Sequence, residues 1–464
     1  MTPGLRAALR RLASVRDDEA QALVWSGLFC FLVFAGWYIL RPLREEMGIA
    51  GGVRNLPWMF TGTLLATLLA SPLFSALVSR CSRRRFIPAA FHFFAANLVL
   101  FFVLFRLLPE AGRAGAARAF YIWTSVFNLF VVSLFWAYMA DIFRSDQGKR
   151  LFGFISAGGT LGGIAGSLLT ASTVGIVGST SLLLLAAVLM EASLVGFGRL
   201  ESLSAARGTA AGAGAAPVAA RLDRTGAWGG LTLVLRSPYL LVIALCMLLF
   251  TTTSTFVYLE QARIIQAASA SPEARTAIFA RIDLLVNVLA LLGQALLTGR
   301  IIAAIGLGPT QSILPAVSLC GFAALVPFPM LSVLAAFQVA RRASDYATAK
   351  PAREVLYTVL PSEEKYKAKS FIDTFVYRGG DAAGAWVYKI LTSSGDPARR
   401  VLLASLPIVV LWMGLSLLLG RWQRSRAAAQ TGRYETSGGT PTPDGSIGAS
   451  PVTRAPDAGD APAG

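Results

Sequence analysis

Ionisable side chains stand at the end of a long apolar stretch, FAGWYILRPLREEMG, which begins at Phe34. An ionised side chain in the middle of a bilayer costs about 3 kcal/mol on insertion scales, so such a residue faces the interior of a helix bundle. There it pairs with an opposite charge or binds a solute. The guanidinium groups of Arg41 and Arg44 favour phosphate and carboxylate groups, which they bind through two parallel hydrogen bonds. The motif therefore indicates a site for an anionic or zwitterionic solute, or a set of ion pairs.

Polar stripes at helical spacing occur in other apolar stretches, where residues three, four and seven apart share one face. Asp283 and Asn287 are four residues apart, as are Asp373, Tyr377 and Asp381. We expect the stripes to line a cavity with the substrate-binding residues Arg41, Arg44, Asn128, Asp141, Asp283, Asn287, Arg341, Arg378 and Lys389. Gating or charge pairing is expected for Glu45, Glu46, Arg342, Asp345, Asp373 and Asp381. For each single pair, an ion pair that only locks helices together is the alternative.

The composition predicts an all-α polytopic membrane protein. Hydrophobic residues make up 55% of the 464 residues and charged residues only 14%, with a mean hydropathy of +0.60, whereas soluble proteins carry about 25% charged residues. A helix needs roughly 20 apolar residues to cross a bilayer, and the chain contains about twelve such windows. They lie near residues 20–40, 57–79, 86–107, 119–142, 150–172, 176–197, 238–260, 277–298, 309–329, 331–349, 370–392 and 400–420.

The windows fall into two groups of six, separated by a segment rich in Ala and Gly. This 6+6 arrangement is typical of the major facilitator bundle, whose halves rock about a site near the membrane midplane. The tail after Arg426 is rich in Gly, Pro, Ser and Thr, which predicts disorder. The predicted domains are a cytoplasmic segment at 1–19, six-helix bundles at 20–197 and 238–422, a cytoplasmic linker at 198–237 and a disordered cytoplasmic tail at 423–464.

The formal charge of +17 is explained by loops on one side of the membrane. Arginines gather before the first window and after the second, fourth and last windows, so the positive-inside rule predicts that both termini are cytoplasmic. We therefore expect a multi-pass protein of the inner membrane, with the lipid bilayer and a small anionic solute as partners and without a nucleic-acid partner. We also expect a monomer.

Several classes of chemistry have no support in the sequence. The four cysteines are scattered and the single histidine, His92, lies between apolar residues, so neither a metal site nor a catalytic residue is predicted. The glycines at spacing four, Gly158, Gly162 and Gly166, are followed by no Lys-Ser/Thr pair, so they do not form a phosphate loop. They are expected to pack a partner helix closely instead. The chain is thus expected to need no cofactor and to be no enzyme.

Five segments resemble the bacterial ATP/ADP carrier-like transporters, which exchange nucleotides and belong to the major facilitator superfamily. The most distinctive of them is KPAREVLYTVLPSEEKYKAKSFIDTFVYRGGD, which begins at Lys350, and the resemblance extends from about Ala20 to Trp422. In that family, functionally important charges lie in the first, fourth, eighth and eleventh helices. The matching positions here are Arg41 or Arg44, Asp141, Asp283, and Arg378 or Lys389, with Arg in place of Lys in the first helix and Asp in place of Glu.

The resemblance implies nucleotide exchange by alternating access, and the residues by themselves leave other solutes open. A nucleotide needs several converging cations and flat side chains, which Arg41, Arg341, Tyr38 and Tyr377 supply. The acidic residues of the same stripes suit proton coupling of another small organic solute equally well. Other phosphorylated or carboxylated solutes, and a membrane sensor or assembly factor that transports nothing, are the remaining alternatives.

Overall fold

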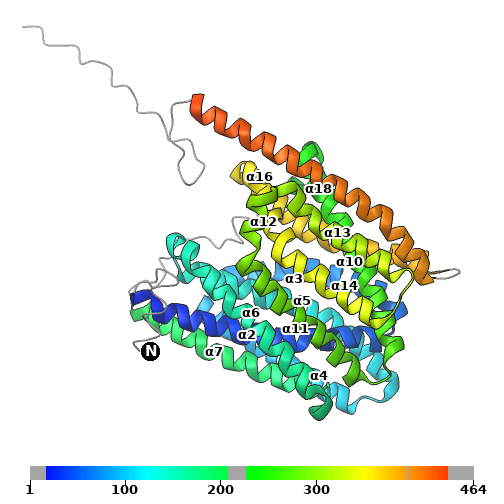
Figure 1. Ribbon diagram of the computed structural model, residues 1–464. Coiled ribbons are helices and arrows are strands. Elements are labelled where there is room, and N and C mark those ends of the chain that lie inside the picture. The colour runs from blue at the N-terminus through cyan, green and yellow to red at the C-terminus, as the bar shows by residue number, and fades with distance from the viewer. Residues whose placement is uncertain (1–16, 207–225, 394–396, 437–464) are drawn as a thin grey trace, which may run out of the picture.

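The computed structural model describes residues 17–206, 226–393 and 397–436, and within them every regular element is helical. The first half comprises α2 (Asp17–Ala50), α3 (Leu56–Arg80), α4 (Arg83–Leu107), α5 (Glu110–Ile142), α6 (Ser145–Val177) and α7 (Leu182–Ala206), with a 3-10 turn, η1 (Val53–Asn55). In Figure 1 these helices form the lower part of the molecule, from blue to green.

The second half has more and shorter elements. It comprises α9 (Gly226–Arg236), α10 (Pro238–Ala268), α11 (Pro272–Leu296), α12 (Thr298–Ile305), α13 (Leu307–Leu325), α14 (Leu331–Ser344), η3 (Asp345–Ala349), α15 (Lys350–Leu356), η4 (Tyr357–Val359), α16 (Ser362–Phe371), η5 (Ile372–Val376), α17 (Tyr377–Leu391) and α18 (Pro397–Thr436). Two of these, η3 and η5, are π-helical turns, which widen the helix locally and recur at functional sites.

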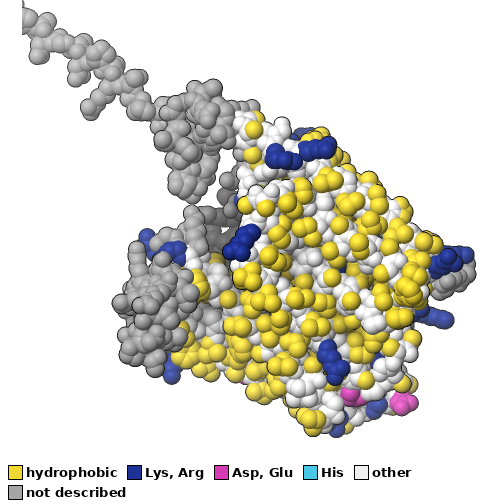
Figure 2. Space-filling model, in the orientation of Figure 1, with side chains coloured by type: hydrophobic (Ala, Val, Ile, Leu, Met, Phe, Trp, Pro, Cys, Tyr) yellow, Lys and Arg dark blue, Asp and Glu magenta, His cyan; other side chains and the backbone are white. Residues whose placement is uncertain are grey.

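Helices long and apolar enough to span a membrane dominate the described residues. Eight helices meet this description, and a ninth span results if α12 and α13, which meet at 116°, are taken together. The predicted windows at 331–349 and 370–392 are helical, but π-helical turns divide them, so α14 and α17 have only 14 and 15 residues. Hydrophobic side chains cover most of the face in Figure 2, as expected for contact with lipid. The chain is therefore an all-helical polytopic membrane protein.

Two predicted boundaries differ from the structure. The tail was expected to be disordered from residue 423, but α18 continues to Thr436, because its QRSRAAAQ segment consists of good helix formers. The linker was expected at 198–237, but α7 continues to Ala206 and α9 begins at Gly226. The remainder of the expected linker and tail, and most of the segment at 1–19, lie outside the described residues.

In the first half, α2 and α6 meet backbone to backbone. A Cβ added at Gly158 would lie 2.6 Å from the carbonyl oxygen of Gly27, and one at Gly162 would clash with the carbonyl oxygen of Phe31. Gly166 lies in the same way against Ala35. A larger side chain would separate the helices, so the glycines allow the closest approach that two helices can make.

In the second half, Gln294 on α11 and Thr298 at the start of α12 support the π-helical turn η3. A π turn breaks the regular pattern of backbone hydrogen bonds, so carbonyl groups there need other donors. The amide of Gln294 donates to the carbonyl oxygen of Tyr346 at 3.1 Å, and the hydroxyl of Thr298 donates to that of Ala347 at 2.5 Å. Gln294 and Thr298 thus support the backbone of η3, and neither lines the cavity.

Candidate functional site

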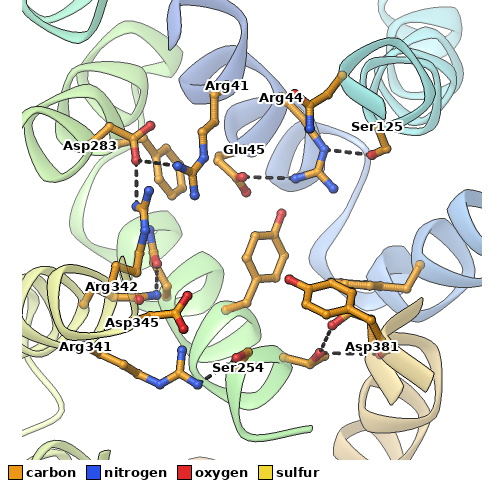
Figure 3. A pocket seen from close by; sticks show the side chains of 18 of the residues that line it. Arg41, Arg44, Glu45, Ser125, Ser254, Asp283, Arg341, Arg342, Asp345 and Asp381 are labelled. Atoms are coloured by element: carbon orange, nitrogen blue, oxygen red, sulfur yellow. Dashed lines mark hydrogen bonds and ion pairs between the residues drawn. The ribbon is translucent and has the colours of Figure 1, made fainter. Parts of the chain in front are cut away.

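A cavity of about 370 Å³ lies between the two halves (Figure 3). Its walls come from α2, α3 and α5 of the first half and from α10, α11, α14, η3 and α17 of the second. The charged side chains that line it are Arg41, Arg44, Glu45, Asp283, Arg341, Arg342, Asp345, Arg378 and Asp381. Five arginines face four carboxylates, so the cavity carries an excess of one positive charge. An excess of positive charge in a cavity favours the entry of anions.

The first group of charges joins the two halves. The Asp283 carboxylate on α11 lies 2.6 Å from the guanidinium of Arg342 on α14, and 3.5 Å from that of Arg41 on α2. All three are clustered at one side of the cavity in Figure 3. We call these residues the Arg41–Asp283–Arg342 cluster.

The second and third groups are pairs within single helices. Arg44 contacts Glu45 at 3.0 Å and donates to the hydroxyl of Ser125 at 3.1 Å. Its guanidinium lies 3.9 Å from the centre of the Tyr121 ring on α5. Arg378 lies 3.9 Å from Asp381 on α17. These contacts hold each arginine in a defined orientation, because both ends of each pair are fixed to the same helix.

Arg341 differs from the other arginines of the cavity. It is only 5% exposed, and it donates to the hydroxyls of Ser254 at 2.7 Å and Ser318 at 3.2 Å. Among the described ion pairs it has no carboxylate partner. Hydroxyl groups satisfy its N–H donors, and the carboxylate of Asp345 acts on its charge without forming an ion pair with it, so the Arg341 guanidinium remains a candidate cation for binding an anionic group.

Most of the predicted site residues line the cavity, and five do not. Those brought together are Arg41, Arg44, Asn128, Asp283, Arg341 and Arg378 of the expected binding residues, and Glu45, Arg342, Asp345 and Asp381 of the expected gating or pairing residues. Asp141, Asn287, Lys389, Glu46 and Asp373 lie elsewhere.

The placement of Asp141 and Lys389 in the cavity was wrong. Asp141 lies at the end of α5, where its side chain is 54% exposed and 3.9 Å from Arg83. Lys389 is exposed and lies 4.9 Å from the centre of the Trp386 ring. It shares a helical face with Arg378, but a separation of three turns carries it about 16 Å along the axis, beyond the cavity.

Asn287, which was predicted to bind the solute, also lies outside the cavity, and so does Asp373, which was predicted to take part in gating or charge pairing. Asn287 is 5% exposed and packs against Gly163, where an added Cβ would lie 3.3 Å from its Cγ atom. It therefore belongs to the contact between α11 and α6. Asp373 is exposed because it lies in η5, whose π turn rotates it away from the face that carries Asp381.

Glu46 forms a buried ion pair that joins the halves at one end of the bundle. Its carboxylate accepts two hydrogen bonds from the guanidinium of Arg275 on α11, at 2.6 and 2.7 Å, and Glu46 is fully buried. At the same end, the indole of Trp386 donates to the hydroxyl of Thr61 and packs edge-on against Trp58. These contacts close this end of the space between the halves.

Sequence reasoning missed Arg275 as a partner of Glu46, because Arg275 lies just before the apolar window at 277–298. It also gave no role to Ser254 and Gln261 on α10, which line the cavity together with Tyr258. The spacing of four and three residues in STFVYLEQ places them on one face and was a usable signal. The described residues contain no group of three or more His, Cys, Asp or Glu side chains suited to a metal ion.

Comparisons with known proteins define the fold. No family model and no curated protein sequence matches this chain. The structure of the nucleoside transporter NupG matches with a TM-score of 0.58 at 12% identity, over 87% of this chain and 99% of that one. A bacterial homologue of the iron transporter ferroportin, in an inward-facing state, matches with a TM-score of 0.62 at 12% identity, over 87% and 98%.

A third structure, a POT family transporter in complex with 5-aminolevulinic acid, matches with a TM-score of 0.55 at 11% identity, over 87% of this chain and 96% of that one. The protein therefore has the major facilitator fold. None of these matches singles out the ATP/ADP carrier-like family within that fold.

Proposed function

We propose that this protein is a secondary transporter that moves a small solute with an anionic group across the inner membrane by alternating access. The observation that carries the proposal is the central cavity, in which charged residues of both halves converge around an excess positive charge. Burying charged side chains inside a membrane bundle costs free energy, and a bound solute of opposite charge offsets part of that cost. With both termini cytoplasmic, as the arginine distribution predicts, the end closed by Glu46 and Arg275 faces outward.

Nucleotide exchange is the substrate class that the sequence resemblance favours. The cavity has the groups that such a solute needs, because arginines can bind phosphate while Trp37, Tyr38 and Tyr377 offer flat surfaces to a base. No covalent step is part of this function, and the side chains are needed only to bind and release the solute.

Proton-coupled transport of another small organic solute is the second candidate. It is favoured by Asp345, whose Oδ1 atom is buried and has no hydrogen-bond partner among the described residues. Acidic side chains inside transporter bundles serve in proton relays, so this carboxylate is the candidate residue for proton coupling.

Transport assays with reconstituted protein test both candidates. Proteoliposomes loaded with ADP should take up labelled ATP only when internal nucleotide is present, and a proton ionophore should have no effect. Arg341→Gln should reduce the uptake at least about tenfold, since it removes the cation without a carboxylate partner. Uptake that follows a pH gradient without a counter-substrate supports proton coupling. If no solute from a broad anionic panel crosses faster with protein than without it, the transporter proposal is wrong.

A further inference from the structure

The Arg41–Asp283–Arg342 cluster holds two cations around one anion. Both arginines contact the same carboxylate oxygen, Oδ1 of Asp283. The Asp283 side chain is 4% exposed, whereas those of Arg41 and Arg342 are 22% and 16% exposed. The cluster thus has one uncompensated positive charge, and its cations are more accessible from the cavity than its anion.

The donors of the cluster exceed its acceptors as well. A guanidinium group has five N–H donors, so one carboxylate cannot satisfy two of them. In agreement with this, Nη2 of Arg342 is buried and has no hydrogen-bond partner among the described residues. Nη2 of Arg342 can therefore donate to a further acceptor beside Asp283.

The other ion pairs of the cavity are balanced. Arg44 pairs with Glu45 on α2, and Arg378 pairs with Asp381 on α17, each as one cation with one anion in one half. Among the described cavity ion pairs, only the Arg41–Asp283–Arg342 cluster combines an excess charge with contacts between the two halves.

On the basis of the transport function proposed above, we infer that the anionic group of the solute, a single carboxylate or phosphate group, binds between Arg41 and Arg342. It binds beside Asp283, and Asp283 competes with it for the two guanidinium groups. A bound anion offsets the excess positive charge of the cluster and accepts a hydrogen bond from Nη2 of Arg342.

The competition has a consequence for the transport cycle. Arg41 belongs to the first half and Arg342 to the second, so an anion held by both joins the halves more strongly than Asp283 does alone. Asp283 offsets only one of the two charges when the site is empty, which leaves the empty protein less able to close around the cavity. A bound anion removes this barrier.

Anion binding to the full-length protein in detergent tests the inference without any transport assay. The probe is inorganic phosphate, titrated at constant ionic strength with sodium chloride as the balancing salt and followed by calorimetry. Asp283→Asn should bind phosphate at least about tenfold more tightly than the unchanged protein, because the competing negative charge is gone. Arg342→Gln should weaken phosphate binding at least about tenfold, since it removes one of the two cations.

Asp373→Asn is the matched control, because it removes the same charge from an exposed position outside the cavity. It should leave phosphate affinity unchanged. The inference is overturned if Asp283→Asn does not tighten binding, or if Asp373→Asn tightens it equally. If Asp283→Asn does not fold, Arg342→Gln decides the matter, and unchanged phosphate affinity in that variant overturns the inference.

The outcome is separable from that of the transport proposal. Tighter phosphate binding by Asp283→Asn, together with no solute uptake by the unchanged protein, would support the anion site and refute transport. Solute uptake by the unchanged protein, with no change of phosphate affinity in either cavity variant, would support transport and refute the anion site.

Discussion

The two halves of the bundle are built differently around a shared cavity. In the first half, α2 and α6 run without interruption for 34 and 33 residues, and glycines bring their backbones together. In the second half, π-helical turns adjoin α14 and α17, and α12 meets α13 at 116°. Close backbone packing resists deformation, whereas a π turn shifts the face of a helix. The first half therefore gives the cavity a fixed wall, and the second gives it a wall whose shape depends on side-chain support.

The largest effect is expected where the two halves are joined. Arg275→Gln leaves the Glu46 carboxylate buried without its cation, which should destabilise the protein by about 3–5 kcal/mol. Thermal unfolding in detergent measures the loss. Lys369→Gln is the control, since Lys369 and Glu354 form a largely exposed pair, with side chains 33% and 51% exposed. It should change stability by less than about 1 kcal/mol. Equal losses in the two variants would show that Glu46 and Arg275 do not hold the halves together.

The next largest loss of stability is expected at the contact between α2 and α6 in the first half. Gly162→Leu forces a side chain against the backbone of α2 and should destabilise the protein by about 3 kcal/mol. Gly175→Leu on the same helix is the control, because an added Cβ at that position meets nothing within 4 Å. Size-exclusion profiles and unfolding temperatures compare the two variants. A well-folded Gly162→Leu protein would contradict the description of the first half as a fixed wall.

The support of the π turn should matter less but should act locally. The double variant Gln294→Leu, Thr298→Val removes both donors to the carbonyl groups of η3, which should destabilise that turn by about 1–3 kcal/mol. Hydrogen exchange should accelerate in residues 344–350 and stay unchanged in α2. Thr160→Val is the control, because the hydroxyl of Thr160 bonds only within its own exposed helix face. Unchanged exchange in η3 would mean that Gln294 and Thr298 do not determine its shape.

The smallest effect is expected from two charges that the sequence placed in the cavity. Asp141 and Lys389, one in each half, are exposed and lie outside it. Asp141→Asn and Lys389→Gln should therefore change solute uptake by less than about twofold, in contrast to Arg341→Gln. A tenfold loss of solute uptake in either variant would show that the residue takes part in transport.

The sequence by itself determined that the chain crosses the membrane many times, and it identified most of the charged residues that line the cavity. These properties depend on local quantities, namely the length of an apolar run and the spacing of polar residues along a helix. Arg41, Arg44, Asp283, Arg341 and Arg378 were found in this way, because burying an ionised side chain in lipid is costly wherever the helix lies.

Only the tertiary structure decided which of these charges meet. Glu46 and Arg275 are 229 positions apart, and their pairing depends on how far α2 and α11 are rotated and shifted along their axes. The same offset removed Lys389 from the cavity, although it lies on the same helical face as Arg378. The π turn η3 was equally invisible in the sequence, since its carbonyl groups are stabilised by Gln294 on α11 and Thr298 on α12. Helical spacing fixes the direction of a side chain, but the axial position and the partner are fixed by packing between helices.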